Sequence, residues 1–208
     1  MTEPDVAITD YLLAVESVIL AALLVGQPPS RPDLQLWFVV FFAATGFASA
    51  LGGTVHGFFV ARPSRVGTVL WRATLISIGV VAAAGWMIGV RMLSSDAPPW
   101  VLTVVVLELV AYAVVVVAVR DAFWVAIANY VPSTGFLLIA YWAAYRSHPT
   151  GAVAIGLAGL ALTLAASVGQ HLRVGIHPVY FNHKALYHVV QGIALFMIFW
   201  SGRHLVSV

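Results

Sequence analysis

The chain has 208 residues, of which 62% are hydrophobic and only 9% are Asp, Glu, Lys or Arg, and its formal net charge is +2. A soluble domain carries roughly 25% charged residues, so the charged side chains here are too few to cover a water-facing surface. The small net charge, without any basic tract, excludes nucleic acid as an expected partner. The absence of cysteine excludes disulfides, thiolate ligands and a cysteine nucleophile. The composition therefore predicts an integral membrane protein.

Long apolar runs predict that the spanning elements are helices. A bilayer admits only helices or closed barrels; barrel strands show about ten alternating residues, whereas a spanning helix needs about 20 apolar ones. In chain order the expected helices cover residues 8–26, 34–60, 67–92, 100–119, 122–145, 151–171 and 184–202. We therefore expect an all-α polytopic membrane protein, a bundle of seven transmembrane helices forming one domain over residues 1–208. Because the connections are short, sequential helices should be antiparallel neighbours.

Basic residues give the expected orientation. The starts of odd-numbered helices and the ends of even-numbered ones share the side of the N-terminus, which we call the N-side. Six basic residues fall on the N-side and four on the other. Those on the N-side are Arg62, Arg65, Arg72, Arg120, Arg173 and Lys184. The positive-inside rule therefore predicts a cytoplasmic N-terminus.

Polar side chains within the expected spans also gather on the N-side. A charged residue at the centre of a spanning helix costs roughly 2.5–3.5 kcal/mol on insertion scales, so each is a candidate for function. The candidates on this side are Asp10, Glu16, Ser49, His56, Arg72, Asn129, His177, His183, Tyr187, His188 and Gln191. Their one-sided placement predicts a polar cavity that opens on the N-side and is built from several helices.

Spacing brings some of these candidates onto shared helix faces. Ser49 and His56 are seven residues apart, which is close to two helical turns, and the Gly52-Gly53 pair between them allows close helix approach. His188 and Gln191 are three apart and share a face. Asn182 is expected to cap the last helix at its N-terminus.

Three histidines suit a metal site. The imidazoles of His56, His183 and His188 would fit a catalytic zinc ion with an open fourth position, which would lower the pKa of a bound water to about 7. Asp10 or Glu16 would then act as general base or orient a histidine ligand. The same groups could instead form a structural hydrogen-bond network, with Asp10 as a helix cap.

Three stretches resemble an uncharacterised family of bacterial seven-helix membrane proteins. They are residues 9–11, 52–57 and 181–191. The family's recurring marks are a Gly-Gly-Thr-x-His-Gly helix end and a Phe-Asn-His…Leu-Tyr-His…Gln segment. This resemblance spans the whole chain and implies a bacterial inner membrane, but it brings no known activity.

A second, distant resemblance is to the superfamily of alkaline ceramidases and adiponectin-type receptors, which are seven-helix zinc hydrolases. His56 matches the superfamily's histidine on helix 2 by placement, and His183 and His188 match its pair on helix 7. The resemblance implies a zinc site. The helix 7 pair of the superfamily is His-x-x-x-His, whereas these two are five apart, and Gly52 stands where the superfamily has a serine. Its helix 3 aspartate has no counterpart in residues 67–92.

The leading hypothesis is therefore a membrane-embedded, zinc-dependent hydrolase that acts on a lipid amide or ester. Membrane lipids are its expected partners. Three alternatives stay open. A proton or small-solute transporter would use Glu16, Glu108 and His188 as a relay; a haem protein would use two histidines as axial ligands; a receptor-like protein would have no chemistry at these residues.

Overall fold

Seven helices make up the part of the chain that the structure describes. The computed structural model describes residues 1–60, 64–177 and 180–208, and no strand occurs among them. The helices are Pro4–Val25 (α1), Pro32–Phe58 (α2), Arg65–Leu93 (α3), Pro99–Val114 (α4), Phe123–Ser147 (α5), Gly151–His171 (α6) and His183–Ser207 (α7), with α4 continuing into a π-helical segment, Val115–Val119 (η1). Taking α4 together with η1, each is long and apolar enough to cross a membrane. The expected all-α bundle of seven helices is confirmed.

The helix ends differ from the expected ones by a few residues. Proline at the first position, as at Pro4, suits a helix start because its fixed φ is helical and its missing N–H needs no partner there. This lets α1 begin four residues earlier than hydropathy predicts. At the other end, α7 runs to Ser207 because the backbone N–H groups of Ser30 and Arg31 donate to the carbonyl of Val206, an acceptor that the helix end leaves free.

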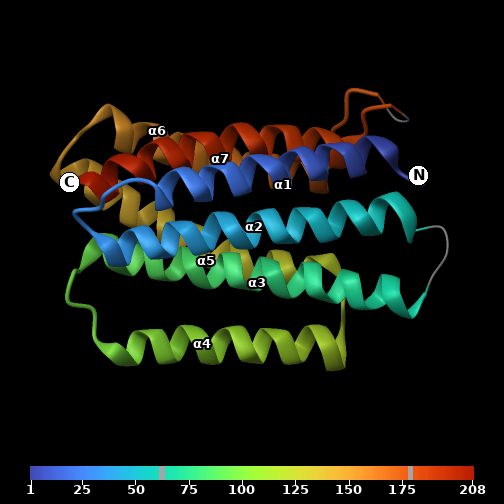
Figure 1. The fold of residues 1–208 in the computed structure, drawn as a ribbon, viewed down its shortest axis with the longest axis horizontal. Coiled ribbons are helices and arrows are strands. Elements are labelled where there is room, and N and C mark those ends of the chain that lie inside the picture. The colour runs from blue at the N-terminus through green and yellow to red at the C-terminus, as the bar shows by residue number, and fades with distance from the viewer. Residues whose placement is uncertain (61–63, 178–179) are drawn as a thin grey trace.

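Figure 1 shows α4 lying apart from the other six helices, whose contacts close a ring. Around the ring the order is α1, α2, α3, α5, α6 and α7, with α7 packing back on α1. The outlying α4 packs on α3, and its remaining surface exposes apolar side chains such as Leu107 and Val110. The expectation that sequential helices are neighbours therefore fails at α4 and α5, because α5 packs on α3 instead.

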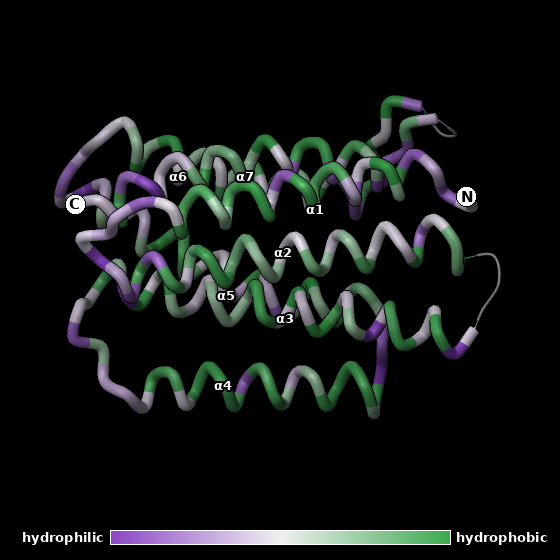
Figure 2. The backbone as a smooth tube through the Cα atoms, in the orientation of Figure 1, coloured by the Kyte–Doolittle hydropathy of each residue, from purple (hydrophilic) through white to green (hydrophobic). Residues whose placement is uncertain are grey.

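The two halves of the ring are filled differently. Large apolar side chains pack the half away from the N-terminus, and the fully buried ones include Leu24, Phe38, Ile88, Tyr141 and Leu195. Hydrophilic residues concentrate in the connections and at helix ends, as Figure 2 shows. Of the basic residues expected on the N-side, Arg62 lies outside the described residues. The packed half fixes the helices, and the N-side half is left to hold a site.

Gly156 on α6 tests this packing. A Cβ at this position would lie 2.3 Å from the Tyr141 ring and 2.5 Å from Ser201 Oγ, and both side chains are fully buried. We expect Gly156→Ala to lower the free energy of unfolding by about 1–3 kcal/mol, the usual cost of overpacking a core. The measurement is unfolding of the purified protein in detergent. Gly135→Ala is the matched control, since a Cβ at Gly135 meets nothing within 4 Å; equal stability of the two variants would contradict the packing described.

Candidate functional site

A cavity of about 350 Å³ lies inside the ring. All six ring helices line it, and α4 contributes no lining residue. Polar side chains line one part of it, namely Asp10, Ser49, His56, Thr74, Lys184, Tyr187, His188 and Gln191. Its inner end has apolar residues, among them Leu137, Leu160 and Ile198, and hydroxyl-bearing residues such as Ser133 and Thr163 also line the cavity. The size is within the usual range for small-molecule sites, and a mostly apolar wall with a few polar groups is typical of them.

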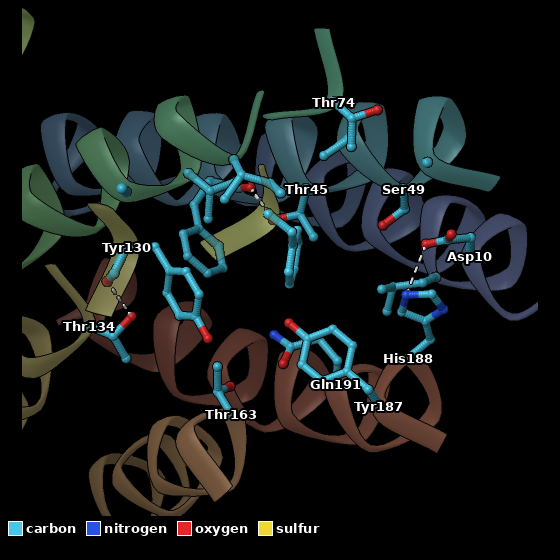
Figure 3. Close-up of a pocket in the computed structure, with 18 of the residues that line it drawn as sticks. Asp10, Thr45, Ser49, Thr74, Tyr130, Thr134, Thr163, Tyr187, His188 and Gln191 are labelled. Carbon is cyan, nitrogen blue, oxygen red and sulfur yellow. Dashed lines mark hydrogen bonds and ion pairs between the residues drawn. The ribbon is translucent and has the colours of Figure 1, made fainter. Parts of the chain in front are cut away.

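Asp10 on α1 and His188 on α7 form a buried pair at the wall of the cavity. Asp10 Oδ1 lies 3.3 Å from His188 Nε2, and the two side chains are 7% and 11% exposed. The other ring nitrogen of His188, Nδ1, lies 3.1 Å from Thr9 Oγ1. Figure 3 shows the pair joined across one end of the cavity. A carboxyl group and an imidazole at this distance form an ion pair when the ring is protonated, and both groups exchange protons, so the pair can give or accept a proton.

Two glycines on α2 make room for Asp10. A Cβ at Gly52 would lie 3.3 Å from Asp10 Oδ2, and one at Gly53 would lie 3.0 Å from Asp10 Cβ and 3.2 Å from the carbonyl oxygen of Ala7. A larger residue at Gly52 would press on the Asp10 carboxyl, and one at Gly53 would also press on the backbone of α1. The two glycines of the Gly-Gly-Thr-x-His-Gly stretch therefore leave space for the Asp10 carboxyl in the wall of the cavity. The close approach of α1 and α2 at this point is the one that the glycine pair predicts.

Gln191, one turn after His188 on α7, has a buried side-chain oxygen that no described residue hydrogen-bonds. The residue is 9% exposed, lines the cavity, and its buried Oε1 atom has no hydrogen bond among the described residues. In Figure 3 the amide lies beside the Tyr187 ring, facing the inside of the cavity. Buried polar groups are nearly always hydrogen-bonded, so this amide is the strongest local sign of a ligand.

Charged residues link the N-terminus to α2 and α7 at the N-side. The Glu3 carboxylate accepts hydrogen bonds from Lys184 Nζ at 2.9 and 3.1 Å and lies 2.5 Å from His56 Nδ1. The backbone N–H of Glu3 also donates to the carbonyl of His56. Burial raises the pKa of the Glu3 carboxyl, but the hydrogen bonds from Lys184 and His56 lower it by more, so it lies below the usual 4.5.

The remaining predicted site residues lie away from the cavity. Arg72 pairs with Asp121 at 3.0 Å, and Asn129 does not line the cavity. His177 accepts a hydrogen bond from the backbone N–H of Tyr180 in the connection before α7. Glu16 lies in a separate groove between α1 and α7.

His183 is the first residue of α7 and does not line the cavity either. The preceding residue, Asn182, caps the helix as predicted, because its side-chain oxygen accepts from the backbone N–H groups of Lys184 and Ala185. His183 is therefore held in the cap at the mouth of the helix, whereas His188 faces the cavity one and a half turns further on.

The three predicted histidine ligands do not meet at one point. Across residues 1–60, 64–177 and 180–208, no group of three or more His, Cys, Asp or Glu side chains is placed to hold a metal ion. Both ring nitrogens of His188 have protein partners, and Nδ1 of His56 contacts Glu3. The side chains as placed do not fit a three-histidine zinc site, and zinc stays a prediction.

Sequence reasoning did not single out Thr9 and Glu3. Thr9 positions the His188 ring, and Glu3 joins His56 to Lys184. Charge complementarity could have predicted the contact of Glu3. The N-terminal residues are acidic, and Lys184, the only lysine among the six basic residues of the N-side, lies on the same side. No sequence signal pairs Thr9 with a residue 179 positions away.

The Glu3 contacts predict a pH-dependent stability. Because the pKa of Glu3 is lowered on folding, its contribution is present above its unfolded pKa and is lost as the pH falls through its folded pKa. We expect Glu3→Gln to lower the unfolding temperature at neutral pH, and this difference from the wild type to shrink below about pH 4.5. Asp33→Asn is the control, since Asp33 is 72% exposed and 3.8 Å from its partner Arg91. A difference that is constant from neutral to acid pH would contradict this role of Glu3.

Comparison with known sequences gives a family but no activity. No curated protein matches the chain significantly, so the resemblance to alkaline ceramidases and adiponectin-type receptors stays a prediction. A family profile matches residues 6–207, a stretch that includes Asp10, His188 and Gln191. The chain therefore belongs to a family of unknown function, DUF6962.

Proposed function

We propose that the cavity binds a lipid-like molecule, with its polar head against Asp10, His188 and Gln191 and its apolar chain against the inner end. The observation that carries this proposal is the buried Gln191 Oε1, which belongs to a residue of the cavity lining and has no hydrogen-bond partner among the described residues. Leaving a buried polar group unpaired costs about 1–3 kcal/mol. An amide both donates and accepts hydrogen bonds, so it suits a head group such as a hydroxyl or another amide.

The Asp10–His188 pair supports hydrolysis of a lipid amide or ester as the reaction. In this proposal the pair takes a proton from a water molecule as its oxygen attacks the carbonyl carbon. It then returns that proton to the nitrogen or oxygen of the leaving group when the carbon–heteroatom bond breaks. General acid–base catalysis of this kind contributes typically 10²–10⁴-fold. No step is assigned to zinc, because the histidines as placed do not form a site for it.

The alternative proton relay has weaker support. It requires Glu108 as well as Glu16 and His188, and Glu108 lies on α4, outside the ring and away from the cavity lining.

We also propose that the protein lies in a bacterial inner membrane with its N-terminus in the cytoplasm. The basic residues Arg65, Arg120 and Lys184 on the N-side support this orientation.

Gln191→Leu tests binding in the cavity. The probe is a long-chain alcohol brominated on its chain, which quenches the fluorescence of a nearby tryptophan; Trp71 lines the cavity, and Trp71→Phe assigns the signal to it. We expect Gln191→Leu to weaken binding at least tenfold because the head group loses its hydrogen bonds to the amide. Gln27→Leu, at the far end of the bundle where Gln27 donates to the carbonyl of Arg203, should bind as the wild type does. Equal affinity of Gln191→Leu and wild type would overturn the proposal.

Asp10→Asn and His188→Gln test the reaction. Each keeps a hydrogen-bonding side chain but removes a group that exchanges a proton, so we expect both to lower the rate of lipid amide or ester hydrolysis by about 10²–10⁴-fold. Release of the fatty acid from purified wild-type protein in lipid nanodiscs is the measurement, together with zinc content per chain. Gln27→Leu serves again as the control.

Two outcomes would count against this mechanism. Undiminished hydrolysis in His188→Gln would remove the pair from the chemistry. One zinc ion per wild-type chain that is lost in His188→Gln would replace the metal-free mechanism with the zinc-dependent one that the sequence predicts.

A further inference from the structure

A second hollow lies on the outer side of the ring, in the groove between α1 and α7. Its rim includes Leu12, Ile193 and Phe196, which are 63%, 55% and 52% exposed. Such apolar side chains on the outside of a spanning bundle face acyl chains in a bilayer. The groove is therefore open to lipid rather than to water.

The groove contains a carboxyl group near the middle of the spanning segment. Glu16 is the thirteenth of the 22 residues of α1, and it is half-buried with no hydrogen bond or ion pair to any described residue. Gly192 on α7 gives it room, because a Cβ there would lie 2.7 Å from Glu16 Oε2. An ionisable group facing the membrane interior is costly and is a candidate for function. A ligand that donates a hydrogen bond would lower this cost.

A thin wall separates the groove from the cavity. Leu13 and His188 line both spaces, so these two residues lie between the groove and the cavity. The N-side route into the cavity is different in character, because Glu3, His56 and Lys184 form an ion-paired cluster there. An apolar chain should pass through an apolar groove more readily than past a charged cluster. Contact with the chain would remove water from the charged groups, and this loss of hydration costs free energy.

We propose that the groove between α1 and α7 is the lateral entrance through which a lipid moves from the bilayer into the cavity, with Leu13 and His188 as the gate. This inference rests on the proposed cavity ligand and narrows its class to lipids whose head donates a hydrogen bond from a hydroxyl or an amide N–H. Glu16 accepts that hydrogen bond in the groove. The head then passes to Asp10, His188 and Gln191, which are the polar groups on the inner side of the wall.

Binding rates test the entrance. With the brominated long-chain alcohol and Trp71 quenching in stopped flow, we expect Gly192→Leu to slow association and dissociation at least tenfold each and to change Kd less than twofold. A blocked entrance changes both rates equally, whereas Gln191→Leu changes Kd. Gly135→Leu is the matched control, because Gly135 is also helical and a Cβ there meets nothing within 4 Å. Ile193→Phe, at an exposed position on the rim, is a second variant that narrows the groove without entering the helix interface and without adding a tryptophan. Wild-type rates in both groove variants would overturn the entrance.

Photolabelling tests the groove independently of the cavity. A long-chain alcohol with a diazirine on its chain, in phosphatidylcholine nanodiscs, should label the α1 and α7 segments around Leu12 and Phe196 in preference to α4. Glu16→Leu should reduce this labelling at least tenfold, and the methyl ester of the same chain, which has no donor, should not compete. Even labelling around the bundle, or labelling unchanged in Glu16→Leu, would overturn the proposed role of Glu16.

The two sets of results separate the two proposals. If Gln191→Leu weakens binding while the groove variants keep wild-type rates, the cavity ligand stands and the entrance fails. If labelling depends on Glu16 while Gln191→Leu binds normally, the cavity proposal fails and the groove remains a site for donor-bearing lipids.

Discussion

The contact between Asp10 and His188 joins the first helix of the ring to the last, and the site depends on it. Both groups lie within the spanning segments, where lipid offers no hydrogen bonds, and each is paired within the protein. Their pairing fixes α1 against α7, and the contact of Thr9 with the second nitrogen of His188 fixes the ring plane. The small residues Gly52 and Gly53 then let α2 approach the same point. Three helices therefore meet around a carboxyl that a larger neighbour would displace.

The cavity exists because this end of the ring is built from small and polar side chains. Ser49 and Thr74 lie on the N-side parts of α2 and α3. The opposite ends of the same two helices carry the larger side chains Phe38 and Ile88. Aromatic and branched aliphatic side chains pack against one another in the far half. The same packing that makes the far half rigid holds the helices at the spacing that leaves the N-side half hollow.

Hydropathy predicted the helices well because each span needs about 20 apolar residues and the composition offers few interruptions. It could not predict which helices touch. The apolar surface of α4 can contact lipid as favourably as protein, so burial does not require it to pack on α5. The two helices therefore do not pack together although the connection between them is short. The ends of α1 and α7 were set by a proline start and by backbone donors from another connection, neither of which is a hydropathy signal.

The site was predicted in part, for a reason of helix geometry. Sorting residues by membrane side gives their approximate depth in the membrane. This sorting correctly grouped Asp10, His56, His188 and Gln191 at a similar depth on the N-side. It does not give rotation about the helix axis. Glu16 follows Asp10 by six residues, which is about 120° around the helix, so the two carboxyls face different spaces. The contact between Thr9 and His188 depends on how α1 and α7 are rotated against each other, which no single sequence specifies.

His188 has a position that links entry to chemistry. It lines both the groove and the cavity, and it is also half of the pair that can give or accept a proton. In the proposed route, a lipid entering past His188 must displace the ring from Asp10 or Thr9, so the pair is broken while the wall is open. When the ring returns, the wall closes and the proton-sharing contact forms again beside the bound head group. Closure to the bilayer and assembly of the acid–base pair would then be one event, which protects the reaction from starting on a lipid that is only partly inside.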